Sequence, residues 1–290
     1  MTKVDQFESL FRSAAKQPYR HRRPRIARVL VVTDLEGDEA RGFLATVRAM
    51  LAVLEPDAAS PERPTWTLVE GHEFATERAL LDLVEAHRPD LCVTYRHLHS
   101  EGWRWHFSLG EHLDVLVNAT TTPVLVLPHP RAGAAAGHAM QDTNRVLVVT
   151  DHLTGDDLLV GWGAALTLTG GTLVLGHVED ARTFARYLEA ISKIPSIDTE
   201  NARERLAERL LKEPRDYIES CVEGLRAARP DLRVLPEVRF GRMLADYERR
   251  VAELEVDLVV FPARDEDQVA MHGLSYPLAV DLRQVPLLLL

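Results

Sequence analysis

Short apolar runs alternate with longer amphipathic segments along most of the chain. The runs, such as VLVV, LCVTY and LVVF, are rich in β-branched residues, which is typical of strands buried on both faces of a parallel sheet. The longer segments carry apolar residues at spacings of three and four, which predicts helices that cover the sheet. Because strands and helices alternate, we expect an α/β fold with right-handed crossovers between parallel strands.

The heptapeptide RVLVVTD occurs twice, at residues 28–34 and again at residues 145–151. A repeat at this distance indicates two copies of one structural unit. Each copy is a buried strand followed by an acid, Asp34 in the first unit and Asp151 in the second. Ligands of open α/β sheets bind at the carboxyl ends of the strands. We therefore expect an acid at the ligand-binding edge of each unit.

The remaining apolar pattern of the first unit fits three helices and three further strands. Helices are expected over residues 38–54, 74–87 and 110–117, and strands over residues 66–71, 91–95 and 123–127. Ahead of this unit, the apolar residues between Val4 and Ala14 have the spacing of a short amphipathic helix. The first unit thus has four strands, or a fifth that has lost its apolar pattern.

The second unit repeats this order with additions. Asp156 or Asp157 is expected to cap its first helix, and strands are expected over residues 172–178, 234–240, 257–262 and 285–290. Strand 172–178 has no clear counterpart in the first unit. Residues 181–229 read as a charged helical insert that Pro195 and Pro214 interrupt. Five strands are therefore expected in this unit.

The chain of 290 residues divides accordingly into an N-terminal helical and basic arm (1–27), a shortened first domain (28–128), a linker (129–144) and a second domain (145–290) that contains the insert (181–229). Residues 129–144 have linker composition. The arm carries Arg20, Arg22, Arg23 and Arg25. Two interpretations stay open for it, a solvated segment on an acidic surface of its own protein, or a site for an anion or a partner.

The closing strands of the two units, residues 122–127 and 285–290, are apolar, and each is expected at an edge of its own sheet. Exposed edges of this kind invite aggregation. We therefore predict that the two domains pair through their last strands across a pseudo-two-fold axis. A homodimer formed through the charged insert is left open.

Composition excludes several classes of protein. The net charge of −10 argues against non-specific binding to nucleic acid or to an anionic membrane surface, and no apolar run is long enough to span a membrane. The first thirty residues lack the apolar centre of a secretory signal. Cys92 and Cys221 have no metal-ligand spacing and read as buried reduced thiols. A cytoplasmic protein is expected.

The order of elements resembles the tandem universal stress protein family, whose domains have a doubly wound, Rossmann-like parallel sheet. The resemblance rests on RVLVVTD at the start of each half, on DLCVTY and DLVVFP as fourth strands, and on the endings SLGEHLDVLVNATTTPVLVLP and HGLSYPLAVDLRQVPLLLL. It covers nearly all of residues 28–290. It implies two tandem domains, a role in the stress response and, in nucleotide-binding members, an ATP site at the strand edge.

The nucleotide loops of that family place Gly-x-x-Gly, nine residues and then Gly-Ser or Gly-Thr after the fourth strand. In the first half only Gly110 fits, because the other glycine positions hold His97 and Ser100 and the hydroxyl position holds Glu111. In the second half Gly273 fits the last glycine, but Ala263 stands where a glycine is expected and the loop carries Asp265, Glu266 and Asp267. Both ATP-binding motifs are degenerate in this interpretation, and a carboxylate at position 111 would repel phosphate.

Other candidate sites are weaker. The histidines near the expected strand edges are His97, His99, His106 and His112 in the first half and His152, His177 and His272 in the second. Imidazole clusters of this kind bind zinc or copper in other proteins. Trp103 and Trp105 suggest a hydrophobic lid over a vacated pocket, and the alternative is that they stack, with Arg104, on a base or a partner. Gly161-Trp-Gly163 lies inside an expected helix and is not a dinucleotide fingerprint, and no Walker motif or G-x-S-x-G elbow is present.

Three functions remain open on the sequence. The favoured hypothesis is a non-enzymatic, universal-stress-type regulatory protein that binds an unknown protein partner or a small ligand, with no catalytic residue, metal ligand or cofactor. The alternative is an adenine-nucleotide-binding universal stress protein with slow ATPase activity. In that case Asp34, Gly110, Asp151 and Gly273 are the nucleotide-binding residues. The third is a metal-binding stress protein that uses the His-rich loop.

Overall fold

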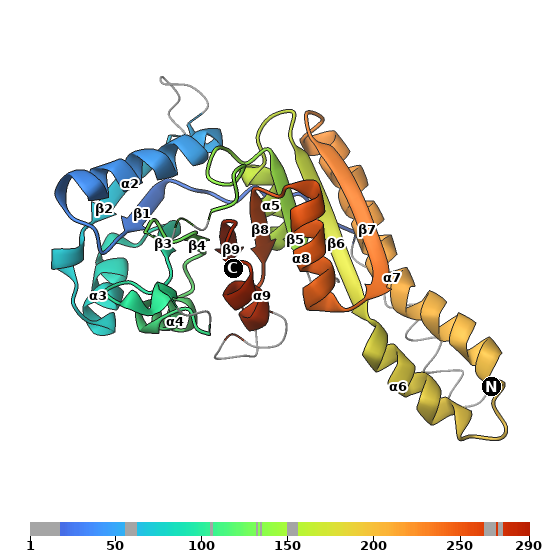
Figure 1. The fold of residues 1–290 in the computed structure, drawn as a ribbon. Coiled ribbons are helices and arrows are strands. Elements are labelled where there is room, and N and C mark those ends of the chain that lie inside the picture. The colour runs from blue at the N-terminus through green and yellow to red at the C-terminus, as the bar shows by residue number, and fades with distance from the viewer. Residues whose placement is uncertain are drawn as a thin grey trace.

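The computed structural model describes residues 18–55, 63–104, 107–131, 133, 135–149, 156–263, 271 and 275–290. Within these residues the fold is α/β, built on one nine-stranded sheet of order β2-β1-β3-β4-β9-β8-β5-β6-β7 (Figure 1). All neighbouring strands are parallel except β4 and β9, which are antiparallel.

The elements have the following bounds. The strands are β1 (Arg28–Val32), β2 (Thr65–Val69), β3 (Leu91–Tyr95), β4 (Val124–Leu127), β5 (Arg145–Val149), β6 (Thr172–Asp180), β7 (Arg233–Gly241), β8 (Leu258–Phe261) and β9 (Leu287–Leu289). The helices are α2 (Gly37–Met50), α3 (Glu77–His87), α4 (Glu111–Ala119), α5 (Asp157–Leu166), α6 (Ala181–Ser192), α7 (Thr199–Ala228), α8 (Met243–Leu254) and α9 (Ser275–Asp281). Short 3-10 helices are η1 (Ala52–Leu54), η2 (Gly71–Glu73) and η3 (Glu101–Arg104).

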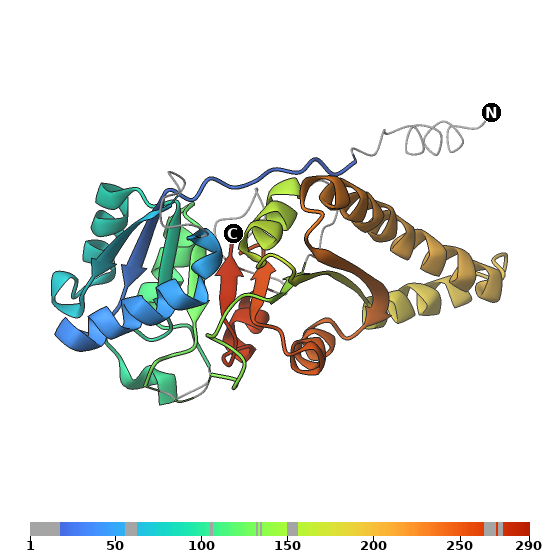
Figure 2. The ribbon, with the colours of Figure 1, turned by 90° about the horizontal axis from the view of Figure 1, so that it is seen from above.

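The two RVLVV strands occupy matching places in the sheet. β1 lies between β2 and β3, and β5 lies between β6 and β8. Every residue of β1 and β5 after the first arginine is buried, as expected of central strands covered on both faces. The helices α3 and α4 pack together below the first half of the sheet while α2 lies above it (Figure 1). In the second half α5 and α7 lie on one side and α8 on the other (Figure 2).

The first half meets the second through β4 and β9. The antiparallel register pairs Val124 with Leu289, Leu125 with Leu288 and Val126 with Leu287. Both strands are buried along their whole length. The apolar closing strands therefore lie in the middle of one continuous sheet, where neither exposes its backbone edge.

Two details of the expected element order are wrong. Strand 172–178, expected to lack a counterpart, is β6, and it flanks β5 as β2 flanks β1. The strand without a counterpart in the first half is β7, at the outer edge of the sheet. Pro214 does not interrupt the insert, since α7 runs through it for 30 residues. The break near Pro195 is present, between α6 and α7.

Proline inside α7 is tolerated because the helix is held on both sides of it. The part before Pro214 packs on α6, and the part after it packs on β6 and β7. These contacts offset the cost of proline inside a helix, about 3 kcal/mol, which comes from the lost hydrogen bond and from the clash of the ring with the preceding turn. The helices α6 and α7 form a hairpin that projects beyond the end of the sheet (Figures 1 and 2).

The residues before β1 cross the second half of the molecule before they enter the first. The buried ring of Tyr19 lies against Gly224 of α7, and its N–H donates to the Ser220 hydroxyl at 3.1 Å. The carbonyl oxygen of Arg22 lies so close to Gly161 of α5 that a Cβ there would be 2.0 Å away. The close approach of the arm thus accounts for Gly161 of the Gly-Trp-Gly sequence. The helix expected between Val4 and Ala14 lies outside the described residues.

The segment expected to be a linker packs on the core through its described part. Ala139 is buried, the Ala136 N–H donates to the Gln284 carbonyl at 2.9 Å, and the His138 ring lies 3.1 Å from the Val256 carbonyl. The segment is therefore attached to the second half rather than extended between two bodies.

Candidate functional site

Asp34 follows β1 at the carboxyl edge of the sheet, where its side chain meets the end of β3. The Tyr95 hydroxyl, at the last residue of β3, donates to the Asp34 carboxylate. The same hydroxyl oxygen accepts the Asp34 N–H at 3.1 Å and lies 2.7 Å from the Thr33 hydroxyl. Tyr95 is fully buried, so this network is shielded from solvent on one side. Burial, together with the charge of Asp34, raises the pKa of Tyr95 far above its usual range, and the phenol stays a donor.

The second oxygen of Asp34 is also used within the chain. The backbone N–H of His99 donates to Asp34 Oδ2 at 3.0 Å. His99 adopts a left-handed backbone conformation with φ of 55°, as does His97 with φ of 61°. These two left-handed residues, with Leu98 between them, bring the loop after β3 down onto the strand edge. Asp34 therefore ties the loops after β1 and β3 together.

Gly110 precedes α4 and lies directly under this loop. Its φ is +89°, and a Cβ on it would lie 2.8 Å from the backbone N and Cα of His97. The His97 N–H donates to the Leu109 carbonyl at 3.0 Å. The backbone of His97 therefore occupies the space beside the glycine that opens the helix. A phosphate group at this place would have to displace it.

Three aromatic rings pack beside this loop. Phe74 lies 4.7 Å from the His99 ring and 5.7 Å from the His112 ring, and the two imidazoles are 5.5 Å apart, centroid to centroid. Burial lowers the pKa of His112, whose Nε2 has no hydrogen-bond partner among the described residues. Its Nδ1 lies 3.7 Å from a Glu77 carboxylate oxygen. Within the described part of the chain no group of three or more potential metal ligands is assembled.

Arg96 connects the site to the second half. Its guanidinium is buried and donates to the Ala279 carbonyl at 2.7 and 3.0 Å and to the Leu282 carbonyl at 3.1 Å. These acceptors lie at the carboxyl end of α9, where a cation is favourable. Burial lowers the pKa of Arg96 to about 9. A residue adjacent to Tyr95 thus anchors the loop of the first half on a helix of the second.

The expected site residues of the second half lie outside the described residues. These are Asp151 and Gly273, together with His152 and His272. His177 is buried on β6, and its Nε2 lies 3.3 Å from a Glu179 carboxylate oxygen. Of the expected site residues, the structure brings together Asp34 and Gly110, because the loop after β3 contacts both. His106 and the side chains of Trp103 and Trp105 are likewise not described.

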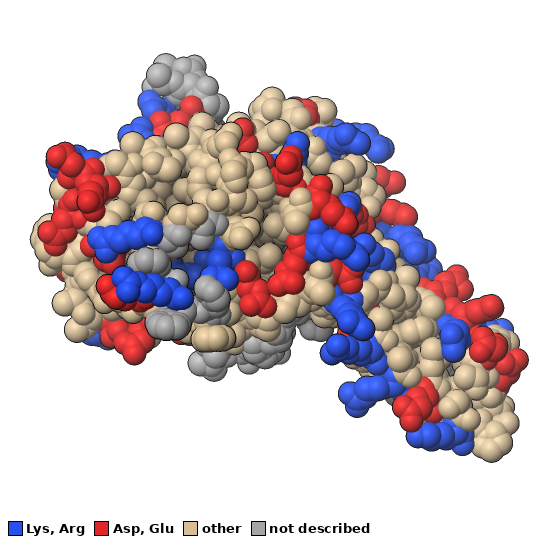
Figure 3. Space-filling view, in the orientation of Figure 1, with Lys and Arg blue, Asp and Glu red and all other residues tan. Residues whose placement is uncertain are grey.

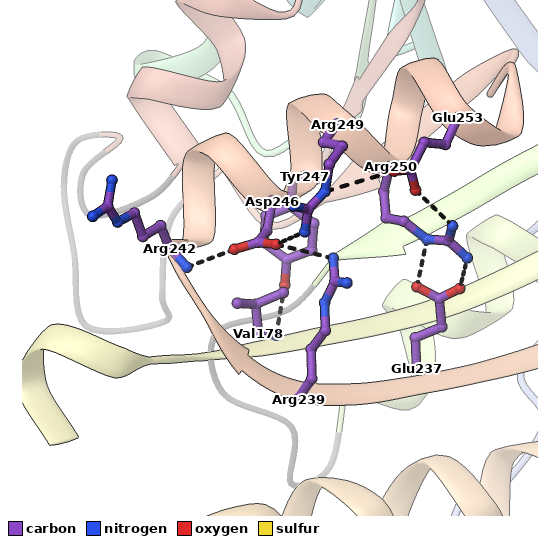
Figure 4. Close-up of polar contacts among 9 residues, drawn as sticks. All are labelled: Val178, Glu237, Arg239, Arg242, Asp246, Tyr247, Arg249, Arg250 and Glu253. Carbon is purple, nitrogen blue, oxygen red and sulfur yellow. Dashed lines mark hydrogen bonds and ion pairs between the residues drawn. The ribbon is translucent and has the colours of Figure 1, made fainter.

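A charged cluster covers the edge of the second half between β7 and α8 (Figure 4). Asp246 accepts the Arg242 N–H at 2.6 Å and lies 3.3 Å from the Arg239 guanidinium. Arg250 pairs with Glu237 through two hydrogen bonds, one of 2.9 Å and one shorter. Because the carboxylates pair with arginines of the same chain, this cluster stabilises the packing of α8 on β7.

The sequence did not point to Tyr95 or to His129. The ring of Tyr95 contacts Phe43 at 5.2 Å and His129 at 4.9 Å, both edge to face. Phe43 comes from α2 and His129 follows β4. A tyrosine as the last residue of a buried strand, aligned with the acid after a neighbouring strand, was the one available signal. Phe43 and His129 line a groove beside α2 of about 420 Å³.

Comparisons with known proteins give no family assignment. No protein-family model and no curated protein matches the sequence. Among solved structures, the functionally unknown protein PA1789 from Pseudomonas aeruginosa PAO1 is 12% identical, with 91% of this chain and 92% of that one covered and a TM-score of 0.47. A protein described as a universal stress protein from Pseudomonas aeruginosa UCBPP-PA14 is 13% identical, with coverage of 91% and 93% and a TM-score of 0.47. Likenesses of this size carry no argument about ligand or activity. No helix within the described residues is long and apolar enough to cross a membrane.

Proposed function

We propose that this chain is a tandem, universal-stress-type regulatory protein that acts by binding and not by catalysis. In the first half, the place that a nucleotide takes in nucleotide-binding members of that family is filled by the chain itself. The proposal draws on the matching places of the two RVLVV strands and on the sequence resemblance that they carry.

One observation carries the proposal. Both carboxylate oxygens of Asp34 accept hydrogen bonds from the chain, one from Tyr95 and one from His99. Each oxygen keeps one further acceptor position, but the bonds from Tyr95 and His99 fix the direction of the carboxylate. A ribose that turned the carboxylate toward itself would break charge-assisted hydrogen bonds, each worth about 1.5 to 3 kcal/mol.

The packing around Gly110 supports the same conclusion. The His97 backbone fills the space beside this glycine, and the next residue, Glu111, adds a negative charge in the first turn of α4. A triphosphate would meet both a steric and an electrostatic barrier at the helix start. ATP hydrolysis is therefore not part of the proposed function.

We assign this function to the cytoplasm as part of the proposal. Cys92 and Cys221 are free and buried, and each is held as a thiol because burial raises its pKa to about 12. Free thiols are usual in reducing compartments.

The test is nucleotide binding by the intact chain. Calorimetric titration with ATP and magnesium is expected to give no measurable binding at 1 mM, and mass spectrometry of the purified protein is expected to find no nucleotide. Tyr95→Phe is the informative variant, because it frees one oxygen of Asp34 without changing the charge. Stoichiometric ATP in the purified wild type, or binding that Asp34→Asn abolishes, would overturn the proposal.

A further inference from the structure

A groove separate from the Asp34 site lies between α2 and the segment that follows β4. Its volume is about 420 Å³, within the range that holds a small organic molecule. The walls are mainly apolar and include Leu35, Phe43, Pro128 and Met140. Its lining includes Leu35, the residue after Asp34, but not Asp34 or Gly110. The rings of Phe43 and His129, which do line it, pack edgewise on Tyr95.

Glu39 is the one acidic or basic residue other than histidine among the described residues that line the groove. Glu39, in the first turn of α2, is exposed and lines the groove, and it makes no ion pair with any described residue. The described lining residues contain no lysine or arginine. Burial lowers the pKa of His129 to about 4, so its ring is neutral at pH 7. Arg131 lies close by, but it is exposed and is not part of the lining.

The surface around the groove carries few charged side chains. Figure 3 shows a wide area without lysine, arginine, aspartate or glutamate over the upper centre of this face, between α2 and the second half. The segment after β4 crosses that area in Figure 1. A ligand in the groove therefore has few charged side chains around it on this face. Glu39 is the charged residue that lines the groove.

We infer that this groove is a binding site for a small apolar or aromatic amine, with its apolar body against Phe43 and Met140 and its ammonium group beside Glu39. The apolar walls supply the binding energy through burial of the ligand. The ring face of an aromatic side chain and a carboxylate both attract a cation. Anionic ligands, nucleotides included, would be repelled by Glu39. The inference does not depend on whether Asp34 binds a nucleotide.

The test uses three probes of one shape, 4-phenylbutylamine, 4-phenylbutan-1-ol and 4-phenylbutyrate. Titration of the full chain, followed by calorimetry or by ligand-observed NMR, is expected to give affinity in the order amine, alcohol, carboxylate. The amine is expected to bind about tenfold more tightly than the alcohol, which corresponds to about 1.4 kcal/mol. Equal binding of the amine and the carboxylate would overturn the inference, and so would the lack of saturable binding of the amine.

Two variants locate the site. Glu39→Gln keeps the shape of the side chain and is expected to reduce the preference for the amine to about twofold or less, with alcohol binding unchanged. Thr46→Trp, at an exposed lining position of α2, is expected to fill the groove and weaken all three probes at least tenfold. Glu36→Gln removes an exposed carboxylate outside the lining and is the matched control. If Glu39→Gln and Glu36→Gln behave alike while both remain folded, the assignment of the ammonium to Glu39 is wrong.

Discussion

The side chain of Asp257 accepts the backbone N–H of Arg145 at 2.7 Å, where β8 and β5 begin side by side. The first half contains the equivalent hydrogen bond, since Asp90 accepts the N–H of Arg28 at 2.9 Å. In each half an aspartate just before one central strand, β3 or β8, thus holds the first residue of the adjacent strand, β1 or β5. The repeated sequence therefore has a repeated hydrogen bond at its start.

Asp257 makes the stability of the protein depend on pH. Burial raises its pKa from 3.8 to about 6, so the folded chain binds the proton more tightly than the unfolded chain does. Stability from this group is therefore greatest below about pH 4 and is lost as the pH rises through 6. Asp257→Asn keeps an acceptor for Arg145 and removes the charge.

We expect Asp257→Asn to be about 1 to 3 kcal/mol more stable than the wild type at pH 8, with the difference shrinking toward pH 4.5. Urea unfolding at both pH values measures this. Asp257→Ala, which leaves the buried N–H without an acceptor, is expected to be less stable at both. An asparagine variant that is less stable than the wild type at pH 8 would contradict the argument.

Tyr95→Phe removes the hydroxyl that donates to Asp34 and accepts its N–H. The variant is expected to lose about 1 to 3 kcal/mol of unfolding free energy, since a buried charge-assisted hydrogen bond is broken. The double variant with Asp34→Asn should lose less than the sum of the single variants, because the two residues share one interaction. Tyr187→Phe, on the exposed face of α6, is the control and should change stability by less than about 0.5 kcal/mol.

Gly110→Ala tests the tight packing under the loop. A Cβ would clash with the His97 backbone at 2.8 Å, and φ of +89° is unfavourable for alanine. We expect a loss of more than about 2 kcal/mol. Gly42→Ala, inside α2 where a Cβ meets nothing within 4 Å, should instead gain about 0.5 to 1 kcal/mol. Similar effects at the two positions in thermal unfolding would show that the packing at Gly110 is not tight.

Gly161→Ala tests the path of the N-terminal arm over α5. The added Cβ would lie 2.0 Å from the Arg22 carbonyl oxygen, so the arm must move away. Trypsin is expected to cut the variant several-fold faster after Arg20, Arg22 and Arg25, which are all exposed. Gly137→Ala, where a Cβ meets nothing within 4 Å, should leave the cleavage rate unchanged. Equal rates in the two variants would show that the arm does not depend on this contact.

Cys92 and Cys221 are expected to resist alkylation in the folded protein. Both are buried, and burial raises the pKa of each thiol to about 12, so little thiolate exists at pH 8. Iodoacetamide at pH 8 should modify neither residue within an hour, and both in 6 M guanidinium, as measured by intact mass. Modification of one residue in the native protein would indicate local opening around it.

The repeat and the apolar runs were sufficient to predict most strands, because central parallel strands have an unmistakable composition. The pattern could not tell β6 from β7 as the strand without a counterpart, since strand pairing is not encoded in the apolar period of either strand. Pro214 misled the prediction of the insert because the packing of α7 on both sides of it is tertiary.

The candidate site was only partly accessible from the sequence. Asp34 and Gly110 could be named from their motifs, but the hydroxyl of Tyr95 that satisfies Asp34 lies in a different strand. That partnership arises from the register of β1 with β3. The groove beside α2 was missed because its walls come from a helix and from a segment with the composition of a linker. A linker composition says nothing about whether the segment packs on the core.

The position of β9 between β4 and β8 has a consequence for how the protein is made. During synthesis every other strand of the sheet leaves the ribosome before Leu287–Leu289 does. Until β9 has been made, the backbone of β4 has no neighbour on one side, and the same holds for β8. These two unpaired edges can pair with other chains during that interval, so chaperone protection is most valuable between the synthesis of β8 and the pairing of β9.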